Sequence, residues 1–405
     1  NTNGLSGSTV TTFSSNYDPA ISLWDGCTVE YNSAATQTIT PRNDYKNLTL
    51  SATGTKTLWG DAAAHALMSV GAPLLIAIGV NLDLYGSLSA TSSITGGNIR
   101  ILGTSARLDL PACDLDNLTL NRAGGCRMTG SVTVENLILS SGVFEISSQT
   151  LTITQAFYES GGSVTGGASS NLVIAGYSYT PALSLPASIT ELNLLDLSRA
   201  NGCSLQGDLA THRLDLNSGS LSVGAHTLTF YGALNITGGT LNAGGSSALS
   251  IQSGSVDIDL PPLSLFALIM NRAGRSCNLG GGTNVAELTM AAGTLNLGDH
   301  HLQVSSASRA TGGSLAGGSG STLTLANTVN LASLPGGSLQ LYNQLCPITV
   351  DLIGSMNLNW LNLASGTLNL VDSYLTIFQG FEQTEITPGS GVISGSSGSG
   401  MNLIS

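Results

Sequence analysis

Charged residues are scarce in this chain: Asp, Glu, Lys and Arg make up 9% of its 405 residues, and aromatic residues only 5%. Disordered proteins combine low hydrophobicity with high charge, whereas 41% of this chain is hydrophobic, so disorder is excluded. The charges that are present give a net charge of −12 at pH 7. That sign argues against nucleic acid and anionic membrane as partners.

Long hydrophobic runs are also missing. A transmembrane helix needs about 20 consecutive apolar residues, but the most apolar stretch, residues 72–80, is short and contains Pro73 and Gly79. We therefore expect no membrane-spanning segment. The chain begins at Asn1 and has no apolar signal segment, so we interpret it as an exported protein after processing, or a fragment of one, located outside the cell or at its surface.

The six cysteines include no CxxC pair, and no His lies at ligand spacing from any of them. We expect neither a metal site nor a dense disulfide framework, and no cofactor. Three cysteines recur at one position of a repeated phrase, and we interpret them as small buried residues. Pairing with Cys27 or Cys113, or bridges between subunits, are the alternatives. The three recurring cysteines are Cys126, Cys203 and Cys277, and Cys346 lies close to the same position of the repeat.

Three phrases recur in the same order, each about 73 to 77 residues after its previous copy, which identifies a repeat protein. One is SSGVFEI, NSGSLSV, AAGTLNL and ASGTLNL; another is GGSVTGGASSNLVI, GGTLNAGGSSALSI and GGSLAGGSGSTLTL; the third is NRAGGC, SRANGC and NRAGRSC. Within the first phrase apolar and polar residues alternate, which is typical of a half-buried strand. Gly, Ser and Asn between such strands supply turns. The apolar positions predicted to form stacked rows in the core are Leu221, Val223, Leu295, Leu297, Leu368 and Leu370.

These strands predict an all-β fold, a parallel β-helix (β-solenoid) built from about five degenerate repeats of roughly 75 residues. If one turn takes about 20 to 25 residues, each repeat holds about three turns. A string of small sandwiches, one per repeat, is the alternative. We expect residues 1–44 to form an amino-terminal cap or docking segment. The repeats then occupy residues 45–405, divided approximately into 45–114, 115–189, 190–264, 265–337 and 338–405.

The amino-terminal repeats resemble a known family. The segments GCTVEYNSAATQTIT at 26–40 and DYKNLTLSATGTKTL at 44–58 are similar to the β-helical strand repeats of large secreted adhesin-like surface proteins of Bacteroidota, and DNLTLNRAGG at 116–125 and SGTLNL at 365–370 continue in the same style. The resemblance implies an extracellular protein, attached to the surface or released, with a role in adhesion, matrix or appendage formation. It implies no catalytic residues.

An enzyme that acts on acidic polysaccharide would need carboxylates converging on one strand face. Two pairs have the required period of two, Asp114 with Asp116 and Asp257 with Asp259, but each is flanked by proline and neither recurs. We interpret them as solvated acids beside turns. The sequence Asp299-His300-His301 is interpreted as a variable turn rather than a metal or base site. We therefore predict no enzymatic activity, and a polysaccharide-acting enzyme or carbohydrate-binding β-helix module is the alternative.

Other polar signals have structural explanations. Arg122, Arg199 and Arg272 recur beside the repeated cysteines, and we interpret them as corner residues that bind backbone carbonyls, with a basic ladder facing a partner as the alternative. Asn47, Asn117 and Asn235 match the glycosylation sequon, which occurs easily by chance in an Asn- and Thr-rich chain.

The two ends suggest how the protein assembles. The last segment, GSGVISGSSGSGMNLIS, still resembles a repeat phrase and contains no charged or helical cap, whereas solenoid ends need protection. The segment before Tyr45 carries Phe13, Tyr17 and Trp24, an unusual share of the aromatic residues, and aromatic side chains are typical of interface centres. We expect copies of this chain to associate head to tail through these residues, as subunits of a surface filament, sheath or adhesive stalk, with cell-surface or matrix polysaccharide as a further partner.

Overall fold

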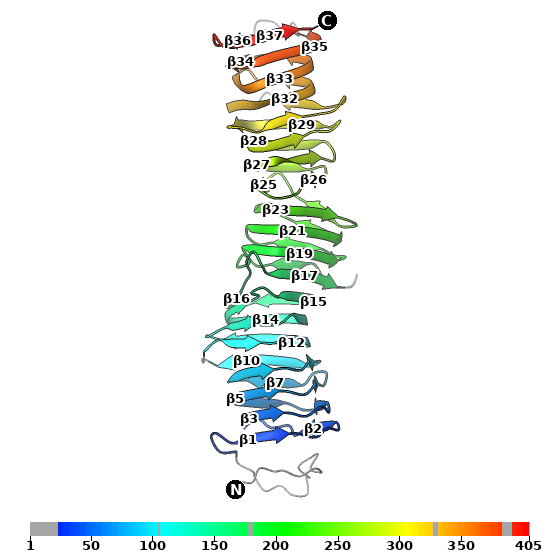
Figure 1. The fold of residues 1–405 in the computed structure, drawn as a ribbon, viewed down its shortest axis with the longest axis vertical. Coiled ribbons are helices and arrows are strands. Elements are labelled where there is room, and N and C mark those ends of the chain that lie inside the picture. Colours follow the sequence, from blue (N-terminus) through cyan, green and yellow to red (C-terminus); the bar gives the residue numbers. More distant parts are fainter. Residues whose placement is uncertain (1–22, 104–105, 177–180, 327–330, 383–390, 405) are drawn as a thin grey trace. The chain divides into compact units, whose positions relative to one another are not determined.

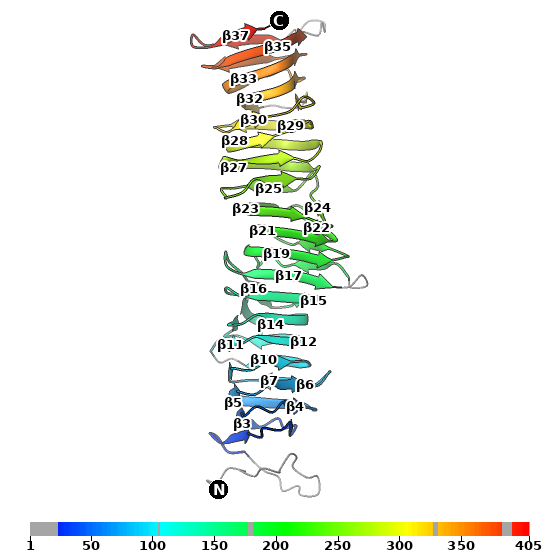
Figure 2. The ribbon, with the colours of Figure 1, turned by 45° about the vertical axis from the view of Figure 1, so that its right-hand side comes forward.

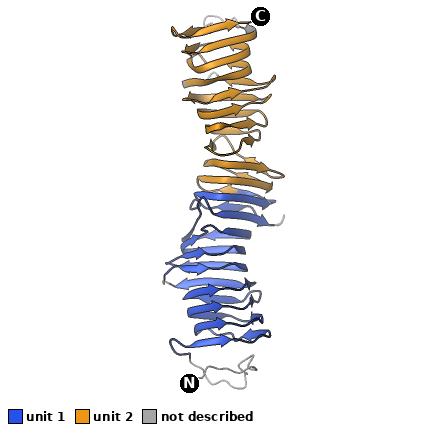
Figure 3. Cartoon of the chain, in the orientation of Figure 1, with its two compact units in different colours: residues 1–203 blue, residues 204–405 orange. Residues whose placement is uncertain are grey.

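The computed structural model describes residues 23–103, 106–176, 181–326, 331–382 and 391–404, without the side chains of residues 331 and 379–382. These residues form strands β1–β37 and contain no helix, so the predicted all-β class is confirmed for them. The chain divides into two compact units, Asn1–Cys203 and Ser204–Ser405 (Figure 3).

The strands of unit 1 are β1 (Thr28–Tyr31), β2 (Gln37–Ile39), β3 (Tyr45–Leu50), β4 (Lys56–Leu58), β5 (Ala62–Val70), β6 (Leu74–Ile76), β7 (Asn81–Leu84), β8 (Ser87–Ala90), β9 (Ile94–Thr95), β10 (Asn98–Gly103), β11 (Leu108–Leu110), β12 (Cys113–Arg122), β13 (Cys126–Met128), β14 (Val132–Glu145), β15 (Thr150–Glu159), β16 (Gly162–Thr165), β17 (Asn171–Gly176), β18 (Leu183–Leu185) and β19 (Glu191–Arg199), and β20 (Cys203–Leu205) begins at its last residue.

The strands of unit 2 are β21 (Leu209–Ser218), β22 (Ser220–Ser222), β23 (Thr227–Ile236), β24 (Thr240–Asn242), β25 (Ala248–Ile251), β26 (Ile258–Leu260), β27 (Ser264–Leu279), β28 (Thr283–Asn296), β29 (His301–Ala310), β30 (Ser314–Ala316), β31 (Thr322–Leu325), β32 (Leu331–Gln344), β33 (Thr349–Leu363), β34 (Thr367–Val371), β35 (Tyr374–Glu382), β36 (Val392–Gly395) and β37 (Gly400–Leu403).

The chain in each unit winds as a β-solenoid, in which every strand lies parallel to the strand of the next turn (Figures 1 and 2). The described residues make about 18 turns in all. Turn length varies: Asn81 lies opposite Asn98, and Tyr374 lies opposite Gly400. The predicted parallel solenoid is thus confirmed. Its pairing already includes β1 and β2, which precede residue 45 and pair with β3 and β4.

Alternating side chains point into the solenoid and form its core. The apolar positions predicted from the period of two are buried, with exposed fractions between 0% and 3%. In unit 2, Leu295 lies between Cys277 and Leu315 of the neighbouring turns, and all three side chains are buried. Because Asn296 falls on the opposite side of the strand, it remains half-buried at the surface.

The sequence repeat does not coincide with a whole number of turns, which corrects the expectation of three turns per repeat. Leu195 of unit 1 is the counterpart of Leu118, 77 residues earlier. We call a row of residues in register on successive turns a column. The column of Leu195 runs back through the preceding turns as Leu172, Leu151, Val132 and Cys113. Cys113 is four turns away, and Leu118 lies five residues after it in another column, between Ile99 and Leu137. The repeat is therefore five residues short of four turns.

Unit 2 has a similar offset, since the repeat there is seven residues short of four turns, and the phrases predicted to stack as rows do not share a column. Leu368 is the counterpart of Leu295, but it lies between Val350 and Ile393. Four turns after Leu295 the column instead reaches Leu375, through Leu315, Gly337 and Met356. Both predicted residues are buried, but equivalent positions occupy different faces of the solenoid.

Candidate functional site

The two acidic pairs are separate surface features, and one of them is bound to the next turn. Asp257 and Asp259 flank the buried Ile258 and so point outward on one side, as predicted. The Asp257 carboxylate accepts a hydrogen bond from the Ser276 backbone N–H at 2.8 Å, and that of Asp259 accepts one from Asn278 Nδ2 at 2.7 Å. Both carboxylates therefore join successive turns.

The other pair lies in unit 1, where Asp114 is exposed and Asp116 is half-buried. Asp114 lines a depression of about 510 Å³ formed by residues 90–95, residues 111–114 and Ser131. Apart from Asp114, the polar side chains of this depression are the hydroxyl groups of Ser and Thr. The lining supplies one carboxylate, whereas acid and base catalysis of glycoside hydrolysis uses two.

The predicted turn at Asp299, His300 and His301 is a tight connection between β28 and β29. The His300 N–H donates to the Leu297 carbonyl at 3.0 Å, and the Asp299 carboxylate accepts from the Gly320 N–H at 3.0 Å. His301 Nε2 lies 2.9 Å from the Thr324 hydroxyl of the next turn. The side chains of Asp299 and His301 thus contact a backbone N–H and a hydroxyl group. Among the described residues no group of three or more His, Cys, Asp or Glu side chains could hold a metal ion.

The recurring arginines are corner residues that bind backbone carbonyls, as predicted. Arg272 is fully buried, and its guanidinium donates to the carbonyls of Val256 and Gln252 at 2.8 Å and of Gly232 at 3.1 Å. Gln252 lies one turn earlier and Gly232 two turns earlier, so a single side chain fastens three turns. The burial of this guanidinium lowers its pKa from the ordinary value.

Arg122 and Arg199 bind carbonyls in the same manner, and both are buried. Each donates to carbonyls one turn and two turns earlier. For Arg122 these are the carbonyls of Leu102, one turn earlier, and of Tyr85, two turns earlier. The alternative, a basic ladder facing a partner, is wrong because the three side chains are exposed by no more than 2%.

The cysteines are free thiols, and all except Cys27 are buried. Burial raises the pKa of the Cys113 and Cys277 thiols to about 12 each. These thiols are therefore protonated at neutral pH. The interpretation of the repeated cysteines as small buried residues is confirmed for Cys126, Cys203 and Cys277.

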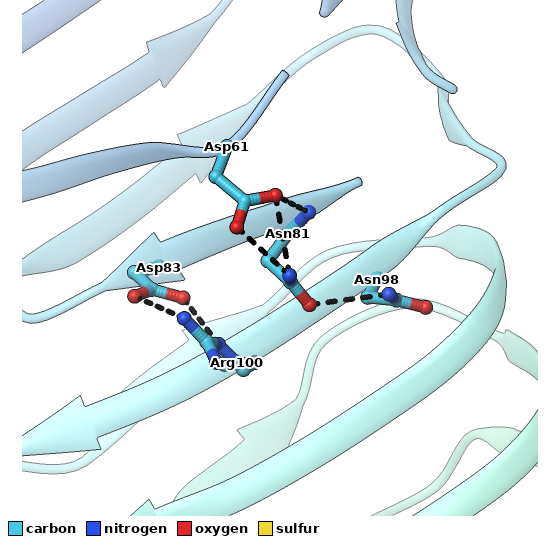
Figure 4. A network of polar contacts seen from close by, with 5 residues as sticks. All are labelled: Asp61, Asn81, Asp83, Asn98 and Arg100. Atoms are coloured by element: carbon cyan, nitrogen blue, oxygen red, sulfur yellow. Dashed lines mark hydrogen bonds and ion pairs between the residues drawn. The ribbon is translucent and has the colours of Figure 1, made fainter. Parts of the chain in front are cut away.

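Amide ladders between turns are a feature that the sequence analysis missed. Asn81 donates from its backbone N–H and from Nδ2 to the carboxylate of Asp61, and its Oδ1 accepts from Asn98 Nδ2 at 3.1 Å (Figure 4). The ladder continues to Asn117 and Asn136 at 2.6 and 2.9 Å. The signal in the sequence is an Asn, usually followed by Leu-x-Leu, that recurs at the length of one turn.

An ion pair lies beside this ladder, and the asparagines of the sequons also form hydrogen bonds between turns. Arg100 binds Asp83 of the previous turn through two hydrogen bonds of 2.6 and 2.7 Å (Figure 4). The sequon amides bind neighbouring turns: Asn117 lies in the ladder, Asn235 Nδ2 donates to Asp215, and Asn47 Nδ2 donates to the Cys27 carbonyl. Among the described residues, every buried side-chain nitrogen and oxygen has a hydrogen-bond partner.

The last described turn leaves inward positions uncovered. Met401 and Leu403 of β37 lie in register with the buried Leu375 and Ile377 of β35. Met401 is nevertheless 45% exposed and Leu403 63% exposed. The difference arises because, within the described residues, β37 pairs on one side only. This apolar surface of β37 is the candidate interface, and we call it the terminal face.

Of the three residues predicted to form an interface, Trp24 is described and is 82% exposed. It precedes β1 in a turn closed by a hydrogen bond from the Cys27 N–H to the Trp24 carbonyl at 3.1 Å. Asp25 beside it pairs with Lys46 at 2.9 Å. Phe13 and Tyr17 lie outside the described residues.

Comparisons with known proteins add no further assignment. In the part of the chain that the structure describes, no helix is long and apolar enough to cross a membrane. No family model, curated protein or solved structure matches the chain.

Proposed function

We propose that this protein is a structural, non-enzymatic subunit that associates end to end with copies of itself outside the cell, in a surface filament, sheath or adhesive stalk. The observation that carries the proposal is the terminal face, where Met401 and Leu403 occupy core positions and yet remain about half exposed. Burial of apolar area contributes about 25 cal/mol per Å², so a further turn on this face is favourable.

A copy of the same chain is suited to supply that turn. Paired strands of successive turns are parallel, so the first turn of one molecule can continue the parallel pairing at the last turn of another. In the described residues, β1 and β2 also pair on one side only, with β3 and β4. Such a contact joins two different surfaces and generates a filament if its rotation does not close.

The resemblance of residues 26–58 to surface-protein repeats supports an extracellular location, as does the acidic, charge-poor composition. We further propose that about five degenerate repeats of roughly 75 residues built the chain, each somewhat less than four turns long. Cell-surface or matrix polysaccharide is the proposed partner besides the copies themselves.

The test measures assembly of the purified protein by light scattering and negative-stain imaging over a range of concentrations. We expect fibres whose length increases with concentration. The double variant Met401→Glu and Leu403→Glu places charge on the terminal face and should remain monomeric. Deletion of residues 1–25, which removes Phe13, Tyr17 and Trp24, should likewise give a β-rich monomer that does not elongate.

The matched control is the double variant Ile353→Glu and Val371→Glu, which adds the same charge at two apolar side chains that are 38% and 42% exposed on the outer surface of β33 and β34. It should assemble like the parent. If the unmodified protein stays monomeric at high concentration, or if the terminal-face variant forms the same fibres, the proposal fails. Further turns of the same polypeptide would then be the better candidate for covering β37.

A further inference from the structure

An exposed aromatic surface lies on the side of unit 2, on the outward face of strands β32, β33 and β35. Trp360 is 37% exposed and Phe378 is 42% exposed. The two residues are 18 positions apart in the sequence, and the parallel register brings their turns together: Leu358 lies opposite Ile377, and a bulge follows at the position of Phe378. Leu341 is half-buried and in register with Trp360. We call the surface formed by Leu341, Trp360 and Phe378 the aromatic surface.

The indole of Trp360 is covered by its column on one side only. Leu341 is its neighbour in the previous turn, and Gly380 is its neighbour in the next turn. Glycine has no Cβ, so no in-register side chain packs against that flank of the ring.

Uncharged amides border the aromatic surface. Asn359 precedes Trp360 and donates from Nδ2 to Gln340 Oε1 of the previous turn at 2.6 Å. This bond fixes the orientation of both side chains, and it uses one of the two N–H donors of Asn359 and one acceptor site of Gln340. Asn343 lies on the far side of Leu341, so amides are present on both sides of the apolar centre.

We propose that the aromatic surface binds an uncharged polysaccharide that lies flat across strands β32, β33 and β35. A sugar ring presents C–H groups on its face and hydroxyl groups on its edge, so the face can pack on the indole while the edge exchanges hydrogen bonds with amides. The chain has a net charge of −12 at pH 7, which disfavours anionic polymers as ligands. The proposal goes beyond end-to-end association and does not depend on it.

The test is affinity electrophoresis in native gels that contain hydroxyethylcellulose, xylan or galactomannan, with alginate as the acidic polymer. We expect at least one of the three neutral polysaccharides to retard the protein and alginate to leave its mobility unchanged. Trp360→Ala should weaken binding about tenfold, since a well-packed aromatic contact is worth roughly 1 kcal/mol or more. Phe378→Ala should weaken it less, because this ring lies at the bulge.

Trp59→Ala is the matched control, because Trp59 is 66% exposed in unit 1 and lies outside the aromatic surface. Its affinity should equal that of the parent, and the circular dichroism melting curves of all variants should coincide. The proposal is overturned if no neutral polysaccharide retards the protein, if Trp360→Ala binds as the parent does, or if alginate retards it equally. Fibre formation by Trp360→Ala should be unchanged; its loss would identify the surface as a contact between copies instead.

Discussion

At the scale of single residues, the buried arginines carry charge into the corners and donate hydrogen bonds there to backbone carbonyls. Arg272 donates to three carbonyls on the two preceding turns, and hydrogen bonds to charged groups contribute about 1.5–3 kcal/mol each. Leaving buried carbonyls without a donor costs about as much. These side chains therefore stabilise the stack of turns rather than a ligand site.

Arg272→Met should lower the free energy of unfolding of its region by about 3–5 kcal/mol, because the apolar side chain cannot donate to the carbonyls that Arg272 binds. The measurement is urea denaturation followed by circular dichroism. Arg275→Met is the control, since Arg275 is exposed three residues later, and it should change stability by less than about 0.5 kcal/mol. Equal effects of the two substitutions would contradict the assignment.

The buried thiols make stability depend on alkaline pH. The pKa values of Cys113 and Cys277 are raised to about 12, so the folded state disfavours both thiolates. Their contribution is complete below the ordinary thiol pKa and is lost as pH rises towards 12, because the unfolded chain releases protons first.

We expect the free energy of unfolding to fall above about pH 9 by roughly 1.4 kcal/mol per pH unit for each such thiol. Urea titrations at pH 8, 9.5 and 10.5 measure this slope. Cys277→Ala should be less stable at pH 8, because it leaves a cavity, but its stability should decline less steeply with pH. A slope identical to that of the parent would rule out the role of this thiol.

Which residues face inward could be predicted from the sequence, because alternation along one strand is a local property. The partners of Asp257 and Asp259 could not, because they lie 19 residues later, on the next turn. The register depends on the length of each turn, which the phrase spacing alone does not give. The repeat-like phrase at residues 389–405 predicted a further strand at this end, whereas the aromatic surface was missed because Trp360 and Phe378 lie on successive turns whose register includes a bulge.

At the scale of the elements, close contacts between turns require glycine at certain corners. A Cβ on Gly86, after Tyr85, would lie 1.6 Å from the backbone oxygen of Ala66 in the previous turn. Gly167, in another corner of unit 1, has no atom within 4 Å of the equivalent position. Both residues have ordinary negative φ, so the difference between them is steric.

Gly86→Ala should therefore destabilise unit 1 by about 1–3 kcal/mol, the usual cost of overpacking, because backbone must shift to admit the methyl group. Gly167→Ala should change stability by no more than about 0.5 kcal/mol. Thermal unfolding of the two variants, compared at one pH and concentration, measures the difference. A fully tolerated alanine at position 86 would show that the corners are less tightly packed than the structure indicates.

At the scale of the whole molecule, stability in a solenoid is a sum of contacts between neighbouring turns. Damage to one turn should therefore affect nearby turns more than distant ones, and unfolding need not be a single two-state transition. Each of the two units has its own buried core residues. We therefore expect the two units to unfold in separate steps.

Leu295→Asp buries an unpaired charge between Cys277 and Leu315, and we expect a loss of more than about 4 kcal/mol around β28. Hydrogen exchange should show lost protection in β27, β28 and β30 and retained protection in β10, β12 and β14. Asn284→Asp places the same charge on the exposed side of β28 and should leave exchange unaltered. Uniform loss of protection along the chain would show instead that the solenoid unfolds as one cooperative body.

The offset between repeat and turn has a consequence for how such a chain can grow. Leu118 and Leu195 are equivalent in sequence, yet they stand in different columns because the repeat is five residues short of four turns. Four turns between Cys113 and Leu195 take 82 residues, so five residues are about a quarter of a turn, and duplication of one repeat would rotate every later surface feature by about that amount about the axis. A binding surface on one flank would then point in a new direction, and about four duplications would restore its original heading. Lengthening by whole turns, in contrast, would extend the molecule without redirecting what it displays.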